Sequence, residues 1–295
     1  MKVQGQGAMG EELELQTPWL RLAARAWGPL DGVPVLALHG WLDNAASFDA
    51  LAPLLSGIRL VALDLAGHGY SDHRPPGSHY HFVDFIPDVA AAADALDWPR
   101  FALLGHSLGG GIATFTAAAL PERVTRLATI EGFGPPTSNP DDSPINLRKA
   151  LMQMHTLPGK RLPLYPSLEA AIQARCEASG LSWQAATILV ERGVKPVGDG
   201  LGWRTDPRLR FVSPLYLTEP QILAYMARIQ APALLLCGDN GFLVKRAYMQ
   251  DRYARVANLT VKILPGGHHP HLEDPESCAR LLGPFLAAAC HPGLS

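Results

Sequence analysis

Short apolar runs, rich in leucine, alanine and β-branched residues, alternate with helix-like patterns along most of the chain. The runs occupy residues 20–27, 33–38, 58–63, 101–104, 124–130, 233–237 and 259–264. Strands that alternate with helices in this way form a mostly parallel sheet with helices on both faces. The pattern therefore predicts an α/β fold.

The clearest helical pattern follows Pro275. Cys278, Leu282 and Phe285 belong to an apolar stripe in which residues recur at three- and four-residue steps. Pro284 lies inside this stripe and is expected to kink the helix. We expect this last helix to cover the edge of the sheet.

The alternation of strands and helices stops between residues 135 and 215. This segment opens with several prolines and continues with helical patterns at 147–154, 167–179 and 183–192, without a convincing strand. We predict that residues 135–215 form an inserted helical cap, or lid, and that residues 1–134 and 216–295 form the core. Apolar cap residues are expected to line the entrance, namely Leu147, Met154, Leu181 and Trp183.

Composition narrows the function classes. Of the 295 residues, 47% are hydrophobic and 18% charged, which is typical of a globular chain. The formal charge of −2 offers no basic field for a nucleic acid or an anionic membrane. No apolar run approaches the ~18 residues that span a bilayer, and the N-terminus has no signal-peptide pattern. We expect residues 1–11 to be a flexible leader.

The four cysteines are scattered along the chain without C-x-x-C spacing. They therefore indicate neither a zinc site nor a disulfide framework, and they suit a reducing compartment. Together with the missing signal peptide, they predict a cytoplasmic protein.

The sharpest chemical signal is G-H-S-L-G, in which an apolar strand leads into Ser107 and a helical pattern begins at about Gly110. A serine at a strained strand-to-helix turn projects its hydroxyl above the sheet. Small residues are needed two positions to either side, here Gly105 and Gly109, because the strand and helix backbones pass closely. The motif predicts that Ser107 is a catalytic nucleophile, whereas the structural alternative is a glycine-rich packing turn.

Two other strand ends carry polar residues. The strand 33–38 runs into H-G-W, where the backbone N–H of Trp41 can join that of Leu108 in an oxyanion hole. His39 itself is expected to be structural. The next strand ends in D-L-A-G-H-G, and we interpret Asp64 and His68 as organisers of that loop.

A general base is expected in G-G-H-H-P-H. His268 follows a strand and two glycines, so it can reach over the strand ends toward Ser107. His269 and His271 are its neighbours and compete for the same role. Pro270 interrupts regular ligand spacing, and no acidic or thiol pattern completes a metal shell, so we expect no metal site.

These motifs resemble those of the capped α/β-hydrolases, in the order and spacing of that family over nearly the whole core. The stretch L-H-G-W-L-D-N-A-A-S-F-D resembles the branch called serine hydrolase-like proteins. The resemblance implies that Ser107 is the nucleophile and His268 the base, with the amides of Trp41 and Leu108 as the oxyanion hole and no cofactor required. A serine at position 107 argues against haloalkane dehalogenase or epoxide hydrolase chemistry, which needs a carboxylate there.

The third triad member departs from the family pattern. The family usually carries its acid in the turn after the strand 233–237, at the position that is Gly241 here. Glu131 ends the strand 124–130, where some relatives carry the acid, and Asp239 lies two residues before the usual position. We predict Glu131 as the acid, with Asp239 as the alternative. If these residues have only structural roles, Glu131 is a carboxylate that caps the start of the inserted segment and Asp239 forms an Asx turn.

The leading functional prediction is hydrolysis of a carboxylic ester or thioester through an acyl-enzyme on Ser107. The same triad is compatible with hydrolytic carbon–carbon cleavage, with lactone opening and with acyl transfer. A non-catalytic receptor that keeps the hydrolase pocket is an alternative from another class, because fold alone does not define function.

Overall fold

The computed structural model describes residues 10–156 and 163–288. In this part of the chain, eight strands form one sheet in the order β1-β2-β4-β3-β5-β6-β10-β11. Strands β1 and β2 and the pair β2 and β4 are antiparallel, and the other neighbours are parallel. The strands are β1 (Glu11–Gln16), β2 (Arg21–Trp27), β3 (Val33–Leu38), β4 (Ile58–Leu63), β5 (Phe101–His106), β6 (Val124–Ile130), β10 (Ala233–Gly238) and β11 (Leu259–Leu264).

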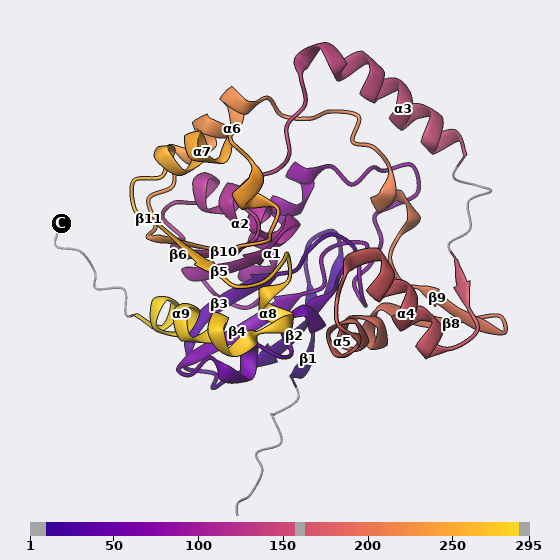
Figure 1. Cartoon of the computed structure of the whole chain (residues 1–295), viewed down its shortest axis with the longest axis horizontal. Coiled ribbons are helices and arrows are strands. Elements are labelled where there is room, and N and C mark those ends of the chain that lie inside the picture. Colours follow the sequence, from indigo (N-terminus) through magenta and orange to yellow (C-terminus); the bar gives the residue numbers. More distant parts are fainter. Residues whose placement is uncertain (1–9, 157–162, 289–295) are drawn as a thin grey trace, which may run out of the picture.

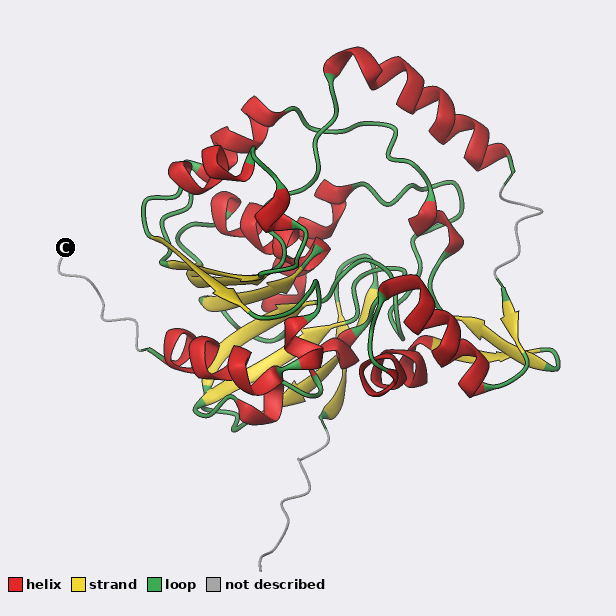
Figure 2. Cartoon of the chain, in the orientation of Figure 1, coloured by secondary structure: helices red, strands yellow, loops and turns green. Residues whose placement is uncertain are grey.

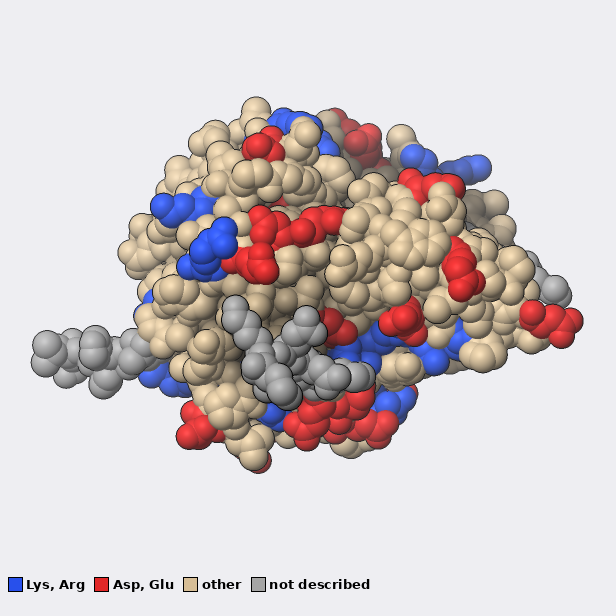
Figure 3. Space-filling model, turned by 60° about the horizontal axis from the view of Figure 1, so that its bottom comes forward, with Lys and Arg blue, Asp and Glu red and all other residues tan. Residues whose placement is uncertain are grey.

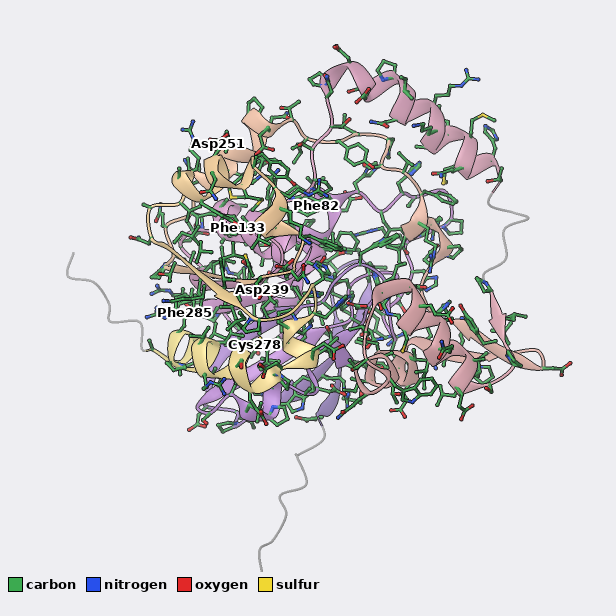
Figure 4. All side chains as sticks on the ribbon, viewed as in Figure 1. Phe82, Phe133, Asp239, Asp251, Cys278 and Phe285 are labelled. Carbon is green, nitrogen blue, oxygen red and sulfur yellow. The ribbon has the colours of Figure 1, made fainter. Side chains whose placement is uncertain are left out.

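Helices cover both faces of this sheet (Figures 1 and 2). The helices on one face are α1 (Phe85–Ala95), α2 (Leu108–Ala119), α6 (Glu219–Met226) and α7 (Met249–Arg255). The other face is covered by α9 (Pro275–Ala287), which carries Cys278 and Phe285, labelled in Figure 4. The α/β fold expected from the alternating pattern is therefore confirmed.

Two details of the core differ from the sequence prediction. The last helix, α9, packs against β3, β6 and β10, so it lies over the middle of the sheet and not over its edge. Strand β1 begins at Glu11, the last residue of the expected leader, and its charged residues alternate with Leu13 and Leu15. A strand with only one apolar face gives a weak signal. Residues 1–9 of the expected leader lie outside the described residues.

The segment 135–215 contains the three expected helices, α3 (Ser143–His155), α4 (Leu168–Ser179) and α5 (Trp183–Gly193). It also contains three short antiparallel strands, β7 (Leu164–Tyr165), β8 (Val194–Val197) and β9 (Gly200–Trp203), so the expectation of a segment without strands was wrong. Strands of two to four residues are too short to show a period of two in the sequence.

The segment 135–215, the expected cap, has a small apolar cluster of its own. Helices α4 and α5 supply most of it, and Leu272 of the short helix α8 (Pro270–Glu273) joins it from the core. Leu181 is buried in this cluster and does not line an entrance, contrary to the expectation. Leu147 and Trp183 are about half exposed, at 47% and 48%. The α4–α5 half of this segment is thus packed around its own apolar cluster.

No described helix combines the length and the apolar character needed to cross a bilayer. On the face of the molecule in Figure 3, acidic and basic side chains are interspersed. This face therefore offers no extended basic surface to a polyanion.

Candidate active site

Ser107 lies at the turn between β5 and α2. Its backbone has φ 51° and ψ −114°, a conformation that non-glycine residues seldom adopt. The two chain segments approach so closely that a Cβ at Gly109 would overlap the carbonyl oxygen of Leu38. Ser107 itself is partly exposed above the ends of the strands. The strained turn predicted from G-H-S-L-G is therefore present.

His268 reaches Ser107 from the loop between β11 and α8. Its Nε2 atom lies 2.9 Å from Ser107 Oγ, across 161 residues of sequence. The ring of Phe242 packs on the imidazole, with ring centroids 4.3 Å apart. The side chain of His268 is 15% exposed, so the imidazole is largely shielded from bulk water.

Glu131 approaches the other nitrogen of His268. Its Oε2 atom lies 3.3 Å from His268 Nδ1, and the carboxylate also accepts the backbone N–H groups of Gly238 (2.9 Å) and Phe242 (2.7 Å). Glu131 directly follows β6, has a positive φ of 48° and is buried. The turn thus places this carboxylate in contact with the end of β10 and with the loop after it.

The alternative acid, Asp239, lies at the end of β10 and is labelled in Figure 4. Its Oδ1 atom accepts the backbone N–H of Gly266 at 3.0 Å, which ties two loops together. The structure explains the glycine at position 241, because a Cβ there would overlap the carboxylate of Glu131. The space that an acid at position 241 would need is therefore filled from the neighbouring strand.

The two expected oxyanion amides belong to adjacent turns. The N–H of Gly109 donates to the carbonyl of His39 at 3.1 Å and so links the turn after β3 to the start of α2. Among the described residues, no group accepts a hydrogen bond from the N–H of Trp41 or of Leu108. The Trp41 indole N–H donates to the carbonyl of Leu209 in the cap, at 2.9 Å.

His39, Asp64 and His68 organise the loops behind the site. The Asp64 carboxylate accepts the backbone N–H groups of Ala45 and Tyr70, and His39 Nε2 accepts the N–H of Leu65. Burial lowers the pKa of His39 to about 4 and that of His68 to about 3, so both rings are neutral at neutral pH.

A cluster of histidines behind His268 was not anticipated as a unit. The rings of His106, His269 and His271 lie close together, and His106 Nε2 donates to the carbonyl of His268 at 2.9 Å. Burial lowers the pKa of His269 to about 3 and keeps the pKa values of the other two well below their usual range. In the sequence, the H-H-P-H pattern places His269 and His271 beside His268. It gives no sign of His106, because that residue joins the cluster from β5.

The same region contains a geometric candidate for a metal site. One ring nitrogen each from His106, His268 and His269 lies within 4.8 Å of the others. However, both nitrogens of His268 face Ser107 and Glu131, and His106 donates to a carbonyl. An ion bound there would need a nitrogen of His268 and would break the contact of that nitrogen with Ser107 or Glu131, so this geometry fits a hydrogen-bonded triad better than a metal shell.

Comparison with known proteins agrees with this geometry. A family model described as the alpha/beta hydrolase fold matches residues 33–275. A serine hydrolase-like protein of Danio rerio is 34% identical, over 93% of this chain and 88% of its own length. Among solved structures, a hypothetical protein of Pseudomonas aeruginosa PAO1 has a TM-score of 0.89 at 44% identity, covering 94% of this chain and 98% of that chain. The thioesterase domain from the curacin biosynthetic pathway has a TM-score of 0.83 at 26% identity, covering 93% and 99%.

The chain therefore belongs to the α/β-hydrolase family. Within that family it groups with the serine hydrolase-like proteins, as the resemblance of its motifs implied.

Proposed function

We propose that the protein is a serine hydrolase that cleaves carboxylic esters or thioesters of a small molecule. Ser107 attacks the carbonyl carbon while His268 Nε2 takes the hydroxyl proton and passes it to the leaving group. Water then attacks the acyl carbonyl carbon while His268 Nε2 takes its proton, and His268 returns this proton to Ser107 Oγ as the acyl–oxygen bond breaks and the acid leaves. Glu131 accepts the Nδ1–H of His268 and stabilises the imidazolium that forms in both steps.

The observation that carries this proposal is the line of contacts from Ser107 Oγ to His268 Nε2 and from His268 Nδ1 to Glu131. The distances of 2.9 and 3.3 Å allow proton transfer and tautomer control without rearrangement. Glu131 takes the role of the acid in this proposal. Its two backbone donors and the packing at Gly241 support that choice, and Asp239 acts as a loop anchor.

The N–H groups of Trp41 and Leu108 form the oxyanion hole in this mechanism. Both are unengaged in the described part of the chain, and α2 directs its N-terminus toward the same point. Preorganised donors of this kind contribute about 3 kcal/mol each to the stabilisation of a tetrahedral oxyanion.

The segment 135–215 acts as a lid that selects the substrate. Its hydrogen bond from the Trp41 indole to Leu209 and the exposed apolar residues of α3 support this role. A relative with 26% identity is a thioesterase domain, which supports a thioester beside an oxygen ester as substrate.

We assign the protein to the cytoplasm, with a small molecule as its partner and neither nucleic acid nor membrane. Its cysteines support this location, because Cys176, Cys237 and Cys278 are free thiols in the structure. The near-neutral formal charge of −2 supports the choice of partner.

The proposal is tested by a fluorophosphonate probe and by p-nitrophenyl esters and thioesters of graded chain length. We expect one adduct per chain, on Ser107, and turnover of at least one acyl length. The matched control is Ser47→Ala, which removes a buried seryl hydroxyl outside the triad. A folded wild-type protein that hydrolyses esters without forming an adduct on Ser107 would refute the proposal.

A further inference from the structure

A chain of buried polar groups connects the cap to the back of His268. It begins at Arg175 on α4, whose Nη2 donates to Asp43 Oδ1 in the turn after β3. The side chain of Asp43 is 2% exposed, and that of Arg175 is 16% exposed. Hydrogen bonds between a guanidinium and a carboxylate that are both shielded from water are strong and directional. This pair therefore holds α4 and the turn in a fixed relation.

The turn that Asp43 occupies also bears the backbone N–H of Trp41, one of the two proposed oxyanion donors, and we call it the oxyanion turn. Asp43 lies two residues after Trp41, and its N–H donates to the carbonyl of Gly40 at 3.1 Å. The next residue, Asn44, donates from its side chain to the carbonyl of Leu189 on α5 at 2.8 Å. The cap thus contacts the turn at three points, through the side chains of Trp41, Asp43 and Asn44.

The second oxygen of Asp43 faces His106. Asp43 Oδ2 lies 3.9 Å from His106 Nδ1, and this fully buried nitrogen has no hydrogen-bond partner among the described residues. Because His106 Nε2–H donates to the carbonyl of His268, Nδ1 carries a lone pair. A lone pair that faces an ionised carboxylate is repelled by it, and a positive charge beside the carboxylate offsets this repulsion. Arg175 supplies that charge.

We propose that Arg175 is a positioning residue, supplied by the cap, for the catalytic centre of the core. By pairing with Asp43 it fixes the oxyanion turn and, through His106, the backbone of His268. Seating of the cap is thereby coupled to the geometry of both the oxyanion hole and the base. The activity readout of this proposal rests on the proposed function, whereas its stability readout does not.

Electrostatics support the need for Arg175. Burial raises the pKa of Asp43, and Arg175, together with His268, opposes that rise. The other rings that face this region, His106 and His269, are neutral at neutral pH because burial lowers their pKa values. Without Arg175, ionised Asp43 would lack its permanent countercharge, and its pKa would rise further.

A second cap–core ion pair provides the matched control. Arg192 on α5 binds Asp64 through Nε and Nη2. Its side chain is 5% exposed and so is more deeply buried than that of Arg175. The other partners of Asp64 are the backbone N–H groups of Ala45 and Tyr70. Loss of Arg192 therefore loosens the cap without removing the countercharge of Asp43.

The experiment compares Arg175→Met, Arg192→Met and the double variant Asp43→Asn/Arg175→Met in the full chain. We expect both single variants to lower the Tm. Only Arg175→Met should lower kcat for a p-nitrophenyl ester by about 10- to 100-fold, because small displacements of catalytic groups have effects of this size. Arg192→Met should retain kcat within about threefold, and KM should change little in either variant.

The stability readout follows from linkage. In Arg175→Met the folded-state pKa of Asp43 lies above its unfolded value of about 4. The stability of the variant relative to wild type should therefore be highest below pH ~4, where Asp43 is protonated in both the folded and the unfolded state. Stability should then fall, relative to wild type, as the pH rises through the raised folded-state pKa. The double variant removes the titrating group, so this loss should disappear and part of kcat should return.

Equal loss of kcat in Arg175→Met and Arg192→Met would overturn the proposal, because Arg175 would then only dock the cap. So would a pH dependence that persists in the double variant. If Arg175→Met does not fold, Arg175→Lys retains the charge and should keep more activity than Asp43→Asn, and the reverse order would also overturn it. A wild-type protein without an adduct at Ser107 would refute the proposed function, while the stability measurements would still test the ion pair.

Discussion

Glu131 in the core and Arg192 in the proposed cap are both buried charged residues with several partners, but the partners that they contact are of different kinds. Glu131 accepts the backbone N–H of Gly238 at the end of β10 and that of Phe242 in the loop after it, and it presents an oxygen to His268. Arg192 directs Nε and Nη2 to Asp64 and Nη1 to Glu12 on β1, at 2.6 Å. The core residue faces the reacting groups, and the cap residue crosses the boundary between the two regions.

Because of this difference, we expect substitutions in the two regions to affect different properties of the protein. Substitutions among the strand-end residues of the core should remove chemistry and leave the fold intact. Substitutions among the anchors of the cap should cost stability first and affect turnover mainly through access and alignment. Arg175 is the proposed exception, because its partner Asp43 lies in the oxyanion turn.

The largest effect is expected for Ser107→Ala. Loss of the nucleophile should lower kcat by about 10⁵- to 10⁶-fold, as removal of a catalytic serine does elsewhere. The Tm should change little, since Ser107 is partly exposed and only one oxygen is removed. Steady-state kinetics and thermal unfolding measure the two quantities. Residual turnover within tenfold of wild type would move the chemistry to another residue.

Glu131→Gln should follow, with a loss of about 10⁴ in kcat, because the amide no longer stabilises the imidazolium or selects its tautomer. Asp239→Asn is the matched control and should stay within a few-fold of wild type, since Asp239 binds Gly266. Kinetics of the two variants with the same ester decide between the acids. A crippled Asp239→Asn beside an active Glu131→Gln would reverse the assignment.

Gly241→Ala should lower kcat by about 100-fold without touching any reacting group. Its Cβ would overlap the Glu131 carboxylate and displace it from His268. Gly267→Ala in the neighbouring loop is the control, because a Cβ there meets nothing within 4 Å. Kinetics and a crystal structure of the variant would test this. Equal activity of the two variants would mean that the loop after β10 moves freely away from Glu131.

In the proposed cap, Arg208→Met should act on stability. The Arg208 guanidinium binds Asp206 and the carbonyls of Arg74, Pro75 and Ser78, so its loss removes the guanidinium that neutralises the buried Asp206 carboxylate. Such losses cost about 3–5 kcal/mol. Urea denaturation should detect this cost, while kcat below the unfolding transition stays within a few-fold. The exposed Arg210 gives the control variant Arg210→Met.

The smallest effect is expected for Leu147→Ala on α3. This side chain is 47% exposed, so its removal should change stability by about 0.5 kcal/mol or less. If α3 contacts the substrate, the preference among p-nitrophenyl esters should shift toward shorter acyl chains by less than about tenfold, since a few methylenes contribute little. Ile145→Ala on the same helix, 53% exposed, is the comparison variant. An unchanged chain-length profile would separate α3 from substrate selection.

The amino-acid sequence by itself determined most strands of the core and the strand-to-helix turn that carries Ser107, the proposed nucleophile. These features depend on neighbours within a few residues: an apolar run, a glycine on each side of Ser107, a strand before it and a helix after it. The same local logic located His268 in its loop. It failed for β1 and for the short cap strands, whose patterns are weak or brief.

Only the tertiary structure decided which carboxylate meets His268 and which cap residue meets the oxyanion turn. Glu131 and His268 are 137 residues apart, and Arg175 and Asp43 are 132 residues apart. No local pattern records such distances, because they depend on the order of strands in the sheet and on how the cap packs against it. The glycine at position 241 was visible in the sequence, but its meaning required the carboxylate that fills its space.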